Sequence, residues 1–301
     1  MKRVINFMGI RHVAFAVTVL LTLISLGSLA VKGLNFGLDF TGGALIELSY
    51  EQPADLAKVR SQLAEVGYGS AVVQHFGATT DVVVRLQGDD PQLGNQLAAD
   101  LAKVSGETFS VKRVEFVGPA VGEELRDQGG LGMLLALGGI LVYVAFRFQW
   151  KFGFGAIVSL IHDVIVTLGV FSFFQIPFDL TVLAAVLALI GYSLNDTIVV
   201  FDRIRENFRV LRKAELIENI NISTTQTLLR TLATSVSTLL AIIALMVFGG
   251  ENLWGFSLAL FIGVTAGTYS SVYIASALLV WLKLTRDDLI PPVVEEVDER
   301  P

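Results

Sequence analysis

Three charged residues lie within, or at the edge of, long apolar stretches of this sequence. Asp163 follows His162 in the third of six such stretches, Asp196 lies in the fourth beside Asn195, and Arg230 immediately precedes the fifth. A charge within the hydrocarbon of a bilayer costs about 3 kcal/mol or more, so such residues are candidates for function. An ionised Asp196 would attract Arg230 at similar depth, and protonation would release it. This pattern predicts a proton-operated switch. Its candidate residues are Asp196, Arg230, Asn195, Asp163 and His162.

Other interpretations fit the same residues. Asp196 and Arg230 could form a permanent structural ion pair, or burial could keep Asp196 neutral. The case for His162 and Asp163 is less direct, because adjacent helix positions point about 100° apart and a single histidine often packs against a backbone carbonyl. An intramembrane aspartyl protease would also use two carboxylates that share a proton. Their different depths, and the lack of a Gly-x-Gly-Asp run, disfavour a protease.

Composition identifies a membrane protein and excludes several classes of function. Apolar residues make up 53% of the 301 positions and charged residues only 17%, against about 25% in soluble domains. A net charge of −6 argues against a nucleic-acid partner. The chain has no cysteine, three scattered histidines and no phosphate-binding Gly-x-x-x-x-Gly-Lys loop. We therefore expect no cofactor, no metal and no enzymatic reaction.

The elements that hold these residues are membrane helices. About 20 apolar residues are needed to cross the bilayer as a helix. The first stretch also resembles a signal peptide, but its apolar run is longer than an ordinary signal core, so we interpret it as an uncleaved span. Six spans are predicted, at 13–31, 128–146, 152 to about 174, 180–201, 231–250 and roughly 253–282.

Positive charges orient the spans. Lys and Arg cluster before the first span, between the second and third, after the fourth and after the sixth, whereas the other short connections have none. Since such residues accumulate on the cytoplasmic side, both termini are predicted inside and residues 32–127 outside. We expect a multi-pass protein of the bacterial inner membrane with a periplasmic domain.

The segment 32–127 is predicted to be a small α+β domain. It has eight Lys or Arg against fourteen Asp or Glu, a balance of −6 that equals the charge of the whole chain. Its periodicity predicts strands at 43–50, 71–76, 81–87 and 108–117 and helices at 54–66 and 91–104. The resulting β-α-β-β-α-β order is typical of a ferredoxin-like fold.

The rest of the chain is assigned to three further segments. Residues 1–31 hold the first span, and 128–285 hold spans two to six with an amphipathic segment at about 202–229 that we expect to lie along the inner membrane surface. The acidic tail 286–301 is expected to be disordered. In the sixth span a small residue recurs at every fourth position, which favours close helix packing. The residues of this stripe are Gly263, Gly267, Ser271 and Ala275.

Two motifs carry a family resemblance. The first is Gly37-Leu38-Asp39-Phe40-Thr41-Gly42-Gly43, just outside the first span, and the second runs from Gly191-Tyr192-Ser193-Leu194-Asn195-Asp196-Thr197 to Asn207. With Thr225-Gln226-Thr227-Leu228-Leu229-Arg230-Thr231, they resemble the SecD/SecF family of the bacterial Sec protein-export machinery, and within it the SecF members. The likeness covers essentially the whole chain. The same architecture is that of the resistance-nodulation-division (RND) superfamily of transporters.

The resemblance implies partners and a mechanism. The implied partners are SecD, the SecYEG channel, the accessory YajC and exported preproteins, with the proton as coupling ion. Asp196 and Arg230 match the family's proton-pathway carboxylate and arginine. Residues Gly37, Asp39, Phe40, Gly42 and Gly43 match the junction between membrane part and outer domain. A passive scaffold of the translocon and one half of an RND-type exporter of small molecules or lipids remain alternatives.

Overall fold

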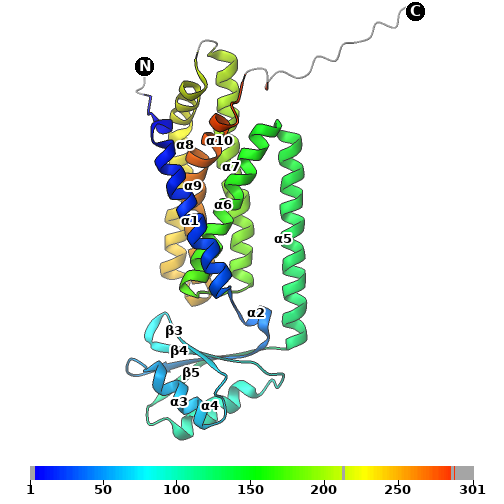
Figure 1. The fold of residues 1–301 in the computed structure, drawn as a ribbon. Helices are drawn as coiled ribbons and strands as arrows, with labels where there is room; N and C mark the ends of the chain where they lie inside the picture. The colour runs from blue at the N-terminus through cyan, green and yellow to red at the C-terminus, as the bar shows by residue number, and fades with distance from the viewer. Residues whose placement is uncertain (1–3, 212–213, 286–287, 289–301) are drawn as a thin grey trace, which may run out of the picture.

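The protein consists of a bundle of long helices and a small α/β domain at one end of it (Figure 1). The structure is a computed structural model that describes residues 4–211, 214–285 and 288. The predicted tail 286–301 therefore lies outside the described residues except for Asp288.

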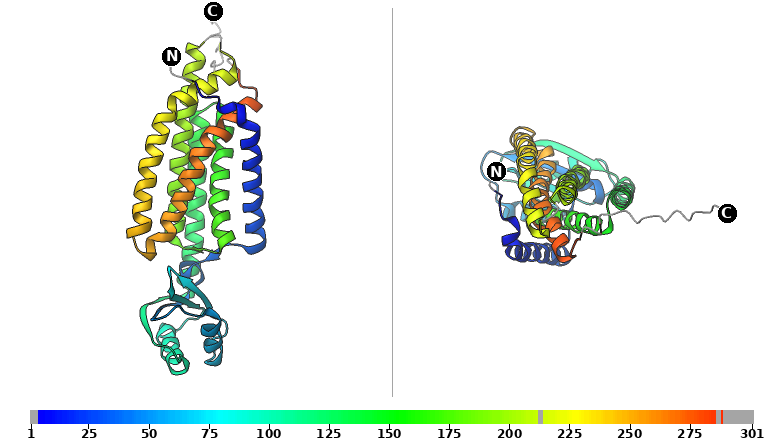
Figure 2. Two further views of the ribbon diagram at one scale, coloured as in Figure 1. Left: turned by 90° about the vertical axis from the view of Figure 1, so that its left-hand side faces the viewer. Right: turned by 90° about the horizontal axis from the view of Figure 1, so that it is seen from above.

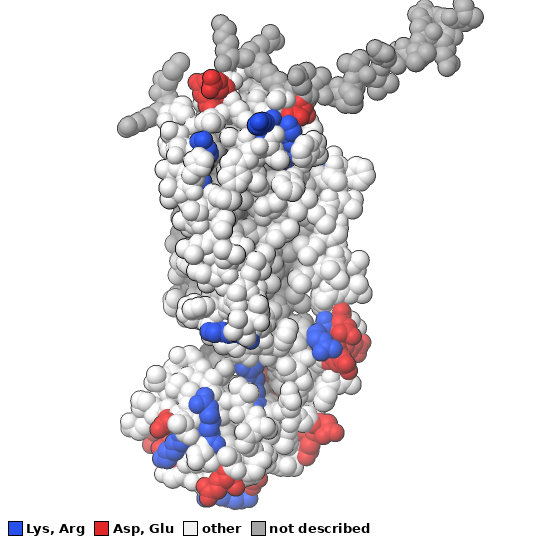
Figure 3. All heavy atoms as spheres, in the orientation of Figure 1, with Lys and Arg blue, Asp and Glu red and all other residues white. Residues whose placement is uncertain are grey.

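Six helical segments in the described part are long and apolar enough to cross a membrane. On the face drawn in Figure 3, charged side chains gather at the two ends of the molecule and leave an uncharged belt between them. The segments are η1 (Phe7–Ile10) with α1 (Arg11–Lys32), α5 (Pro119–Arg147), α6 (Trp150–Phe174), α7 (Leu180–Val210), α8 (Leu216–Phe248), and α9 (Glu251–Ser270), which continues through the π-helical turn η2 (Ser271–Ala275) into α10 (Ser276–Trp281).

Helices α6, α7 and α9 form the centre of the bundle. About half of the residues in their most apolar windows are buried, whereas α1, α5 and α8 are mostly exposed. Figure 2 shows the helices side by side, with the α/β domain beyond the end that is opposite the start of α1. These three helices therefore offer most of the buried positions for polar side chains.

The α/β domain confirms the predicted β-α-β-β-α-β order. Its strands β2 (Gly43–Tyr50), β3 (Val72–Phe76), β4 (Ala78–Leu86) and β5 (Phe109–Val117) form an antiparallel sheet in the order β3-β4-β2-β5. Helices α3 (Leu56–Glu65) and α4 (Leu93–Val104) cover one face, and Figure 1 places the sheet between these helices and the bundle. Alternate strand residues such as Ile46, Leu48 and Val84 are fully buried under the helices, as a one-sided sheet requires.

The other face of the sheet is polar. Asp81 on β4 accepts hydrogen bonds from Lys112 (2.7 Å) and Ser49 (2.6 Å). The Lys112 bond, followed by the Ser49 bond, holds the pKa of Asp81 below its usual value of 3.8. Because the pKa is depressed in the folded state, the carboxylate stabilises the domain fully above that usual value, and the contribution is lost as pH falls through the folded pKa.

We expect the domain to open more readily in acid, and Asp81→Asn to remove part of that dependence. Amide hydrogen exchange of β2 and β4 in the whole chain, from neutral pH down to about pH 3, measures this. The variant should exchange faster at neutral pH and respond less to acidification. An unchanged acid response would show that other carboxylates control it.

Two predicted boundaries differ from the structure. Helix α5 begins at Pro119 rather than at 128, since the chain turns directly from β5 into a helix with proline at its first position. The amphipathic segment 202–229 is not a separate helix along the membrane surface, because α7 continues to Val210 and α8 already begins at Leu216. Apolar residues of both extensions, Ile204 and Ile220 among them, are buried in the bundle core.

Candidate functional site

Asp196 lies on α7 among buried residues. Its side chain is 3% exposed, and no group of the described residues donates a hydrogen bond to its Oδ2. Isolated buried carboxylates are costly when ionised, so such a group needs either a proton or an approaching positive charge. The neighbouring Asn195 points to a different part of the helix surface, where it is exposed.

Arg230 is the charged residue whose field acts on Asp196. It is exposed, and none of the ion pairs within the described residues joins the two. Arg230 and Asn195 both line a hollow of about 520 Å³ between α7 and α8, together with Asp202, Arg203 and Glu206. Arg230 therefore lies across the hollow from Asn195, the neighbour of Asp196, and no ion pair within the described residues joins the two predicted partners.

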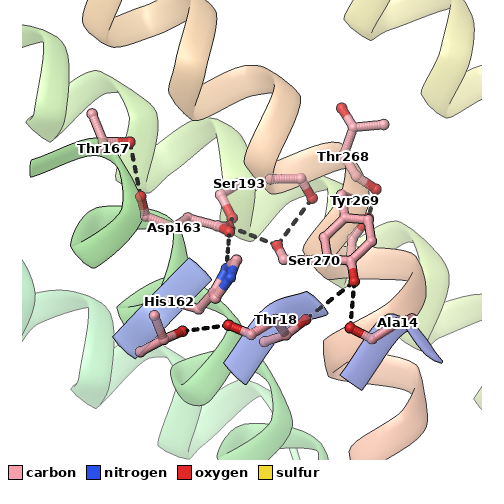
Figure 4. A network of polar contacts seen from close by, with 12 residues as sticks. Ala14, Thr18, His162, Asp163, Thr167, Ser193, Thr268, Tyr269 and Ser270 are labelled. Atoms are coloured by element: carbon pink, nitrogen blue, oxygen red, sulfur yellow. Dashed lines mark hydrogen bonds and ion pairs between the residues drawn. The ribbon is translucent and has the colours of Figure 1, made fainter. Parts of the chain in front are cut away.

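Asp163 is the centre of a hydrogen-bond network that joins three helices (Figure 4). It is completely buried on α6, and its Oδ2 accepts hydrogen bonds from Ser193 of α7 (2.5 Å) and Ser270 of α9 (2.7 Å). His162 Nδ1 lies 3.0 Å from its Oδ1. Asp163 and Asp196 are thus separate sites, and Ser193, which donates to Asp163, lies one helical turn before Asp196.

Sequence reasoning missed Ser270. The hydroxyl lies next to the small-residue stripe, and the only local signal was a polar residue within an apolar span. On α8, Ser235 is buried and contacts Tyr192 (3.3 Å) and Thr268 (2.7 Å). These hydroxyls join α8 to α7 and α9, and no hydrogen bond within the described residues connects them to Asp196.

The small-residue stripe of α9 and η2 packs against other helices of this chain. Gly263, Gly267, Ser271 and Ala275 are all buried. A Cβ atom at Gly267 would lie 3.1 Å from Ser193 Cβ and 3.3 Å from Ser193 Cα. Close approach of α9 to α7 at this point is what allows Ser193 and Ser270 to reach the same carboxylate.

Gly267→Leu is expected to force α7 and α9 apart and to lower the stability of the bundle by about 2 kcal/mol. Gly27→Leu is the matched control, because a Cβ at Gly27 on α1 meets no atom within 4 Å. Thermal unfolding of the two purified variants compares them. Equal unfolding temperatures would contradict the packing argument.

The junction motif connects the bundle to the α/β domain and holds the start of α7. The short helix α2 (Leu38–Thr41) carries Asp39, whose Oδ2 accepts a hydrogen bond from Leu180 N (3.0 Å). Gly37 N donates to Phe178 O (2.8 Å), and Phe40 stacks on Phe178. Alongside, β1 (Asn35–Phe36) pairs in parallel with β6 (Pro177–Phe178).

The two glycines at the end of the motif are required by close backbone contacts. Gly42 (φ 65°) and Gly43 (φ 108°) both adopt conformations that favour glycine. A Cβ at Gly42 would lie 2.8 Å from Pro119 Cα, and one at Gly43 would collide with Leu86 O. The start of β2 and the start of α5 are therefore packed directly against this turn.

Asp39→Ala is expected to loosen α7 at its first turn, because Leu180 N loses its acceptor, whereas Asp39→Asn keeps an acceptor oxygen and should change little. Amide exchange at the start of α7 in the two variants checks this. If both variants exchange alike, the hydrogen bond does not hold the helix.

Two arginines fix the α/β domain to the bundle. Arg85 of β4 donates to Phe36 O (3.0 Å), and Arg113 of β5 donates to Asn252 on α9. A recess of about 360 Å³ lies beside these contacts, between the polar face of the sheet and the loops at the bundle end. Asp39, Arg85 and Arg113 thus connect the junction and the domain to the ends of α7 and α9.

Two family models match the sequence. The model described as protein export membrane protein SecD/SecF, C-terminal, matches residues 96–285, and the model described as SecD/SecF GG motif matches residues 27–54. The chain is 70% identical over 299 residues to protein translocase subunit SecF of Pseudomonas aeruginosa, covering 99% of this chain and 98% of the relative. It is 45% identical over 300 residues to SecF of Escherichia coli O157:H7, covering 98% and 93%.

Solved structures show the same fold. The crystal structure of SecDF, a translocon-associated membrane protein from Thermus thermophilus, matches with a TM-score of 0.86 at 40% identity, covering 94% of this chain and 39% of that one. SecDF in a super-membrane-facing form matches with a TM-score of 0.70 at 40% identity, covering 95% and 40%. The chain thus spans about two fifths of the length of these SecDF chains. Over nearly its whole length, this chain belongs to the SecD/SecF family of protein export membrane proteins.

Proposed function

We propose that the chain is a subunit of the Sec protein translocase that works with a SecD-like partner. The proposal rests on the near full-length likeness to protein translocase subunit SecF, and on the likeness to one portion of the longer SecDF chain. The rest of a SecDF-like unit would be supplied by the separate partner. SecYEG, YajC and exported preproteins are the further partners that we propose, and the chain itself performs no enzymatic reaction.

The proposed orientation places the α/β domain outside and both termini in the cytoplasm of a bacterial inner membrane. The positive residues of the loops support it, because Arg147 ends α5, Lys151 is in the first turn of α6 and Arg203 is near the end of α7, and Figure 1 shows these helix ends opposite the α/β domain. The domain then lies where an exported chain emerges. Its position suits a role in late steps of export.

The single observation that carries the mechanism is the buried, unpaired carboxylate of Asp196 in reach of the field of Arg230. We infer that Asp196 takes up a proton from outside and releases it inside. Ionised Asp196 draws Arg230 inward from its exposed position, whereas protonated Asp196 leaves it there. Arg230 keeps its charge throughout, because guanidinium groups do not deprotonate in proteins.

The energy available is sufficient for such a switch. A proton that crosses about 150 mV yields on the order of 3.5 kcal/mol, which can bias a two-state equilibrium by several hundred-fold. Asp196 lies on α7, and the first turn of α7 is held by Asp39 of the junction. A shift of α7 would therefore reach the α/β domain directly.

The test is export of a preprotein into inverted membrane vesicles that contain or lack this chain, each with and without an imposed proton gradient. We expect the gradient to stimulate export more strongly in vesicles that contain the chain together with its SecD-like partner. A passive scaffold would raise export equally with and without the gradient. An RND-type exporter of small molecules or lipids would leave preprotein export unchanged.

A further inference from the structure

His162 and Asp163 form a buried pair at the centre of the bundle that the mechanism above does not use. His162 is 5% exposed and Asp163 is completely buried. Both oxygens of Asp163 have neighbours that donate, since Oδ2 faces two serine hydroxyls and Oδ1 faces His162 Nδ1 at 3.0 Å. This geometry suits Asp163 as an acceptor of three hydrogen bonds, which assigns the proton between the two residues to Nδ1.

This arrangement leaves Nε2 as the reactive nitrogen of His162. A neutral imidazole that carries its proton on Nδ1 has a lone pair on Nε2. Nε2 is buried and has no hydrogen-bond partner within the described residues. A carboxylate on the opposite side of the ring fixes its orientation and its tautomer, as second groups do for histidines that accept protons.

Charge balance favours uptake of a proton here. With Asp163 ionised and His162 neutral, the pair carries one net negative charge within the bundle. A proton on Nε2 creates an imidazolium beside the carboxylate and makes the pair neutral, without a change elsewhere. Because an unpaired charge is costly to bury, the neutral pair relieves that cost.

A second buried group is available to the added proton. Ser159 lies one helical turn before His162 on α6, and its Oγ is also buried without a hydrogen-bond partner within the described residues. Residues three apart are neighbours on a helix. Ser159 is thus a buried hydroxyl without a partner among the described residues, on the part of α6 next to His162.

Hydroxyl groups lead from the start of α1 toward the pair (Figure 4). Tyr269 OH donates to Ala14 O (2.7 Å) and lies 3.2 Å from Thr18 Oγ1. Thr18 and His162 both line a cavity of about 180 Å³ between α1, α6 and the π-helical turn. Thr18, which contacts Tyr269, therefore shares a cavity with the histidine.

We propose that His162 and Asp163 form a second proton-binding site, in which imidazole Nε2 takes up the proton and Asp163 supplies the compensating charge. The proton comes from water near the start of α1 and breaks no other bond. Its use in export rests on the proposed function, whereas its existence does not.

Few other charged or titratable side chains near the pair compete for the proton. No Lys, Arg, Asp or Glu is among the described residues that line the cavity. Helices α1 and α10 contribute Thr18, Thr22 and Trp281 to it. The titratable groups nearest to these contacts are Tyr273, which lines the cavity, Tyr269, which contacts Thr18, and Tyr192 and Asp196, which flank Ser193 on α7.

The test is nitrogen NMR of the full chain labelled with ¹⁵N-histidine in lipid nanodiscs. His12→Gln and His75→Gln remove the other two imidazoles, so that only His162 is observed. We expect a neutral ring protonated on Nδ1 at about pH 8.5 and an imidazolium at about pH 5.5. In Asp163→Asn the imidazolium signal at the lower pH should be lost.

Two further variants make the outcome decisive. Ser193→Ala removes one hydroxyl from Asp163 but keeps the carboxylate, so the imidazolium signal should persist. Asp196→Asn should also leave it unchanged, which separates this site from the proposed switch. A His162 ring that stays neutral in the unsubstituted chain at both pH values overturns the proposal, whether or not Asp163→Asn folds. An imidazolium that survives in folded Asp163→Asn overturns it as well.

Discussion

In vesicles that carry Asp196→Asn, an imposed proton gradient is expected to add nothing to preprotein export. Asparagine has nearly the size and shape of a protonated aspartate and cannot ionise, so Arg230 would never be drawn inward. The side chain is buried and Oδ2 has no hydrogen-bond donor within the described residues, so the substitution removes no observed contact of that atom. Insertion and association with the SecD-like partner should therefore be normal, and gradient-independent export should persist.

The comparison needs variants with matched protein levels in the membrane. Asp196→Glu keeps an ionisable carboxylate on a longer side chain and should retain part of the gradient stimulation. Asp127→Asn is the matched control, since it makes the same substitution at an exposed carboxylate on α5 and should leave the gradient stimulation unchanged. Equal stimulation in wild type and Asp196→Asn would leave Asp196 with a structural role only, as the scaffold hypothesis holds.

Most of the fold could be predicted from the sequence because it is encoded in short-range patterns. Span length and hydropathy predict the six membrane segments, and the alternation of apolar residues predicts strands such as Gly43–Tyr50 with the bounds that the structure has. The extensions of α7 and α8 were not predicted. Their charged surface suggested a membrane-lying helix, but their buried apolar residues pack on the bundle core instead.

The contacts of the site were harder to predict, because they depend on how helices rotate against one another. The sequence indicated that Asp163 lies within a membrane span, but not that Ser193 and Ser270 donate to it. Likewise, Asp39 and Leu180 are 141 positions apart, and the two-residue pairing of β1 with β6 has no periodic signal. Such contacts follow from tertiary packing and have no local signature.

The largest expected effect on folding is that of Gly43→Ala. Gly43 combines a backbone conformation that disfavours side chains (φ 108°) with a position where a Cβ would collide with Leu86 O of the neighbouring strand. The strain of that conformation and the overpacking should together destabilise the α/β domain by about 3 kcal/mol or more. Since the first strand of the antiparallel sheet begins at this residue, we expect the variant to accumulate poorly in the membrane.

Substitutions at two other glycines of the same domain distinguish the effect of backbone strain from the effect of the collision. Gly67 has a similar conformation (φ 94°) but open space around it, so Gly67→Ala should cost only about 1 kcal/mol. Gly106 has neither a positive φ nor a neighbour within 4 Å, so Gly106→Ala should be neutral. Amide exchange of β2 in the three purified chains ranks them. If β2 exchanges no faster in Gly43→Ala than in Gly67→Ala, local movement relieves the collision with β4. Gly43 would then be required only for the backbone conformation of the turn.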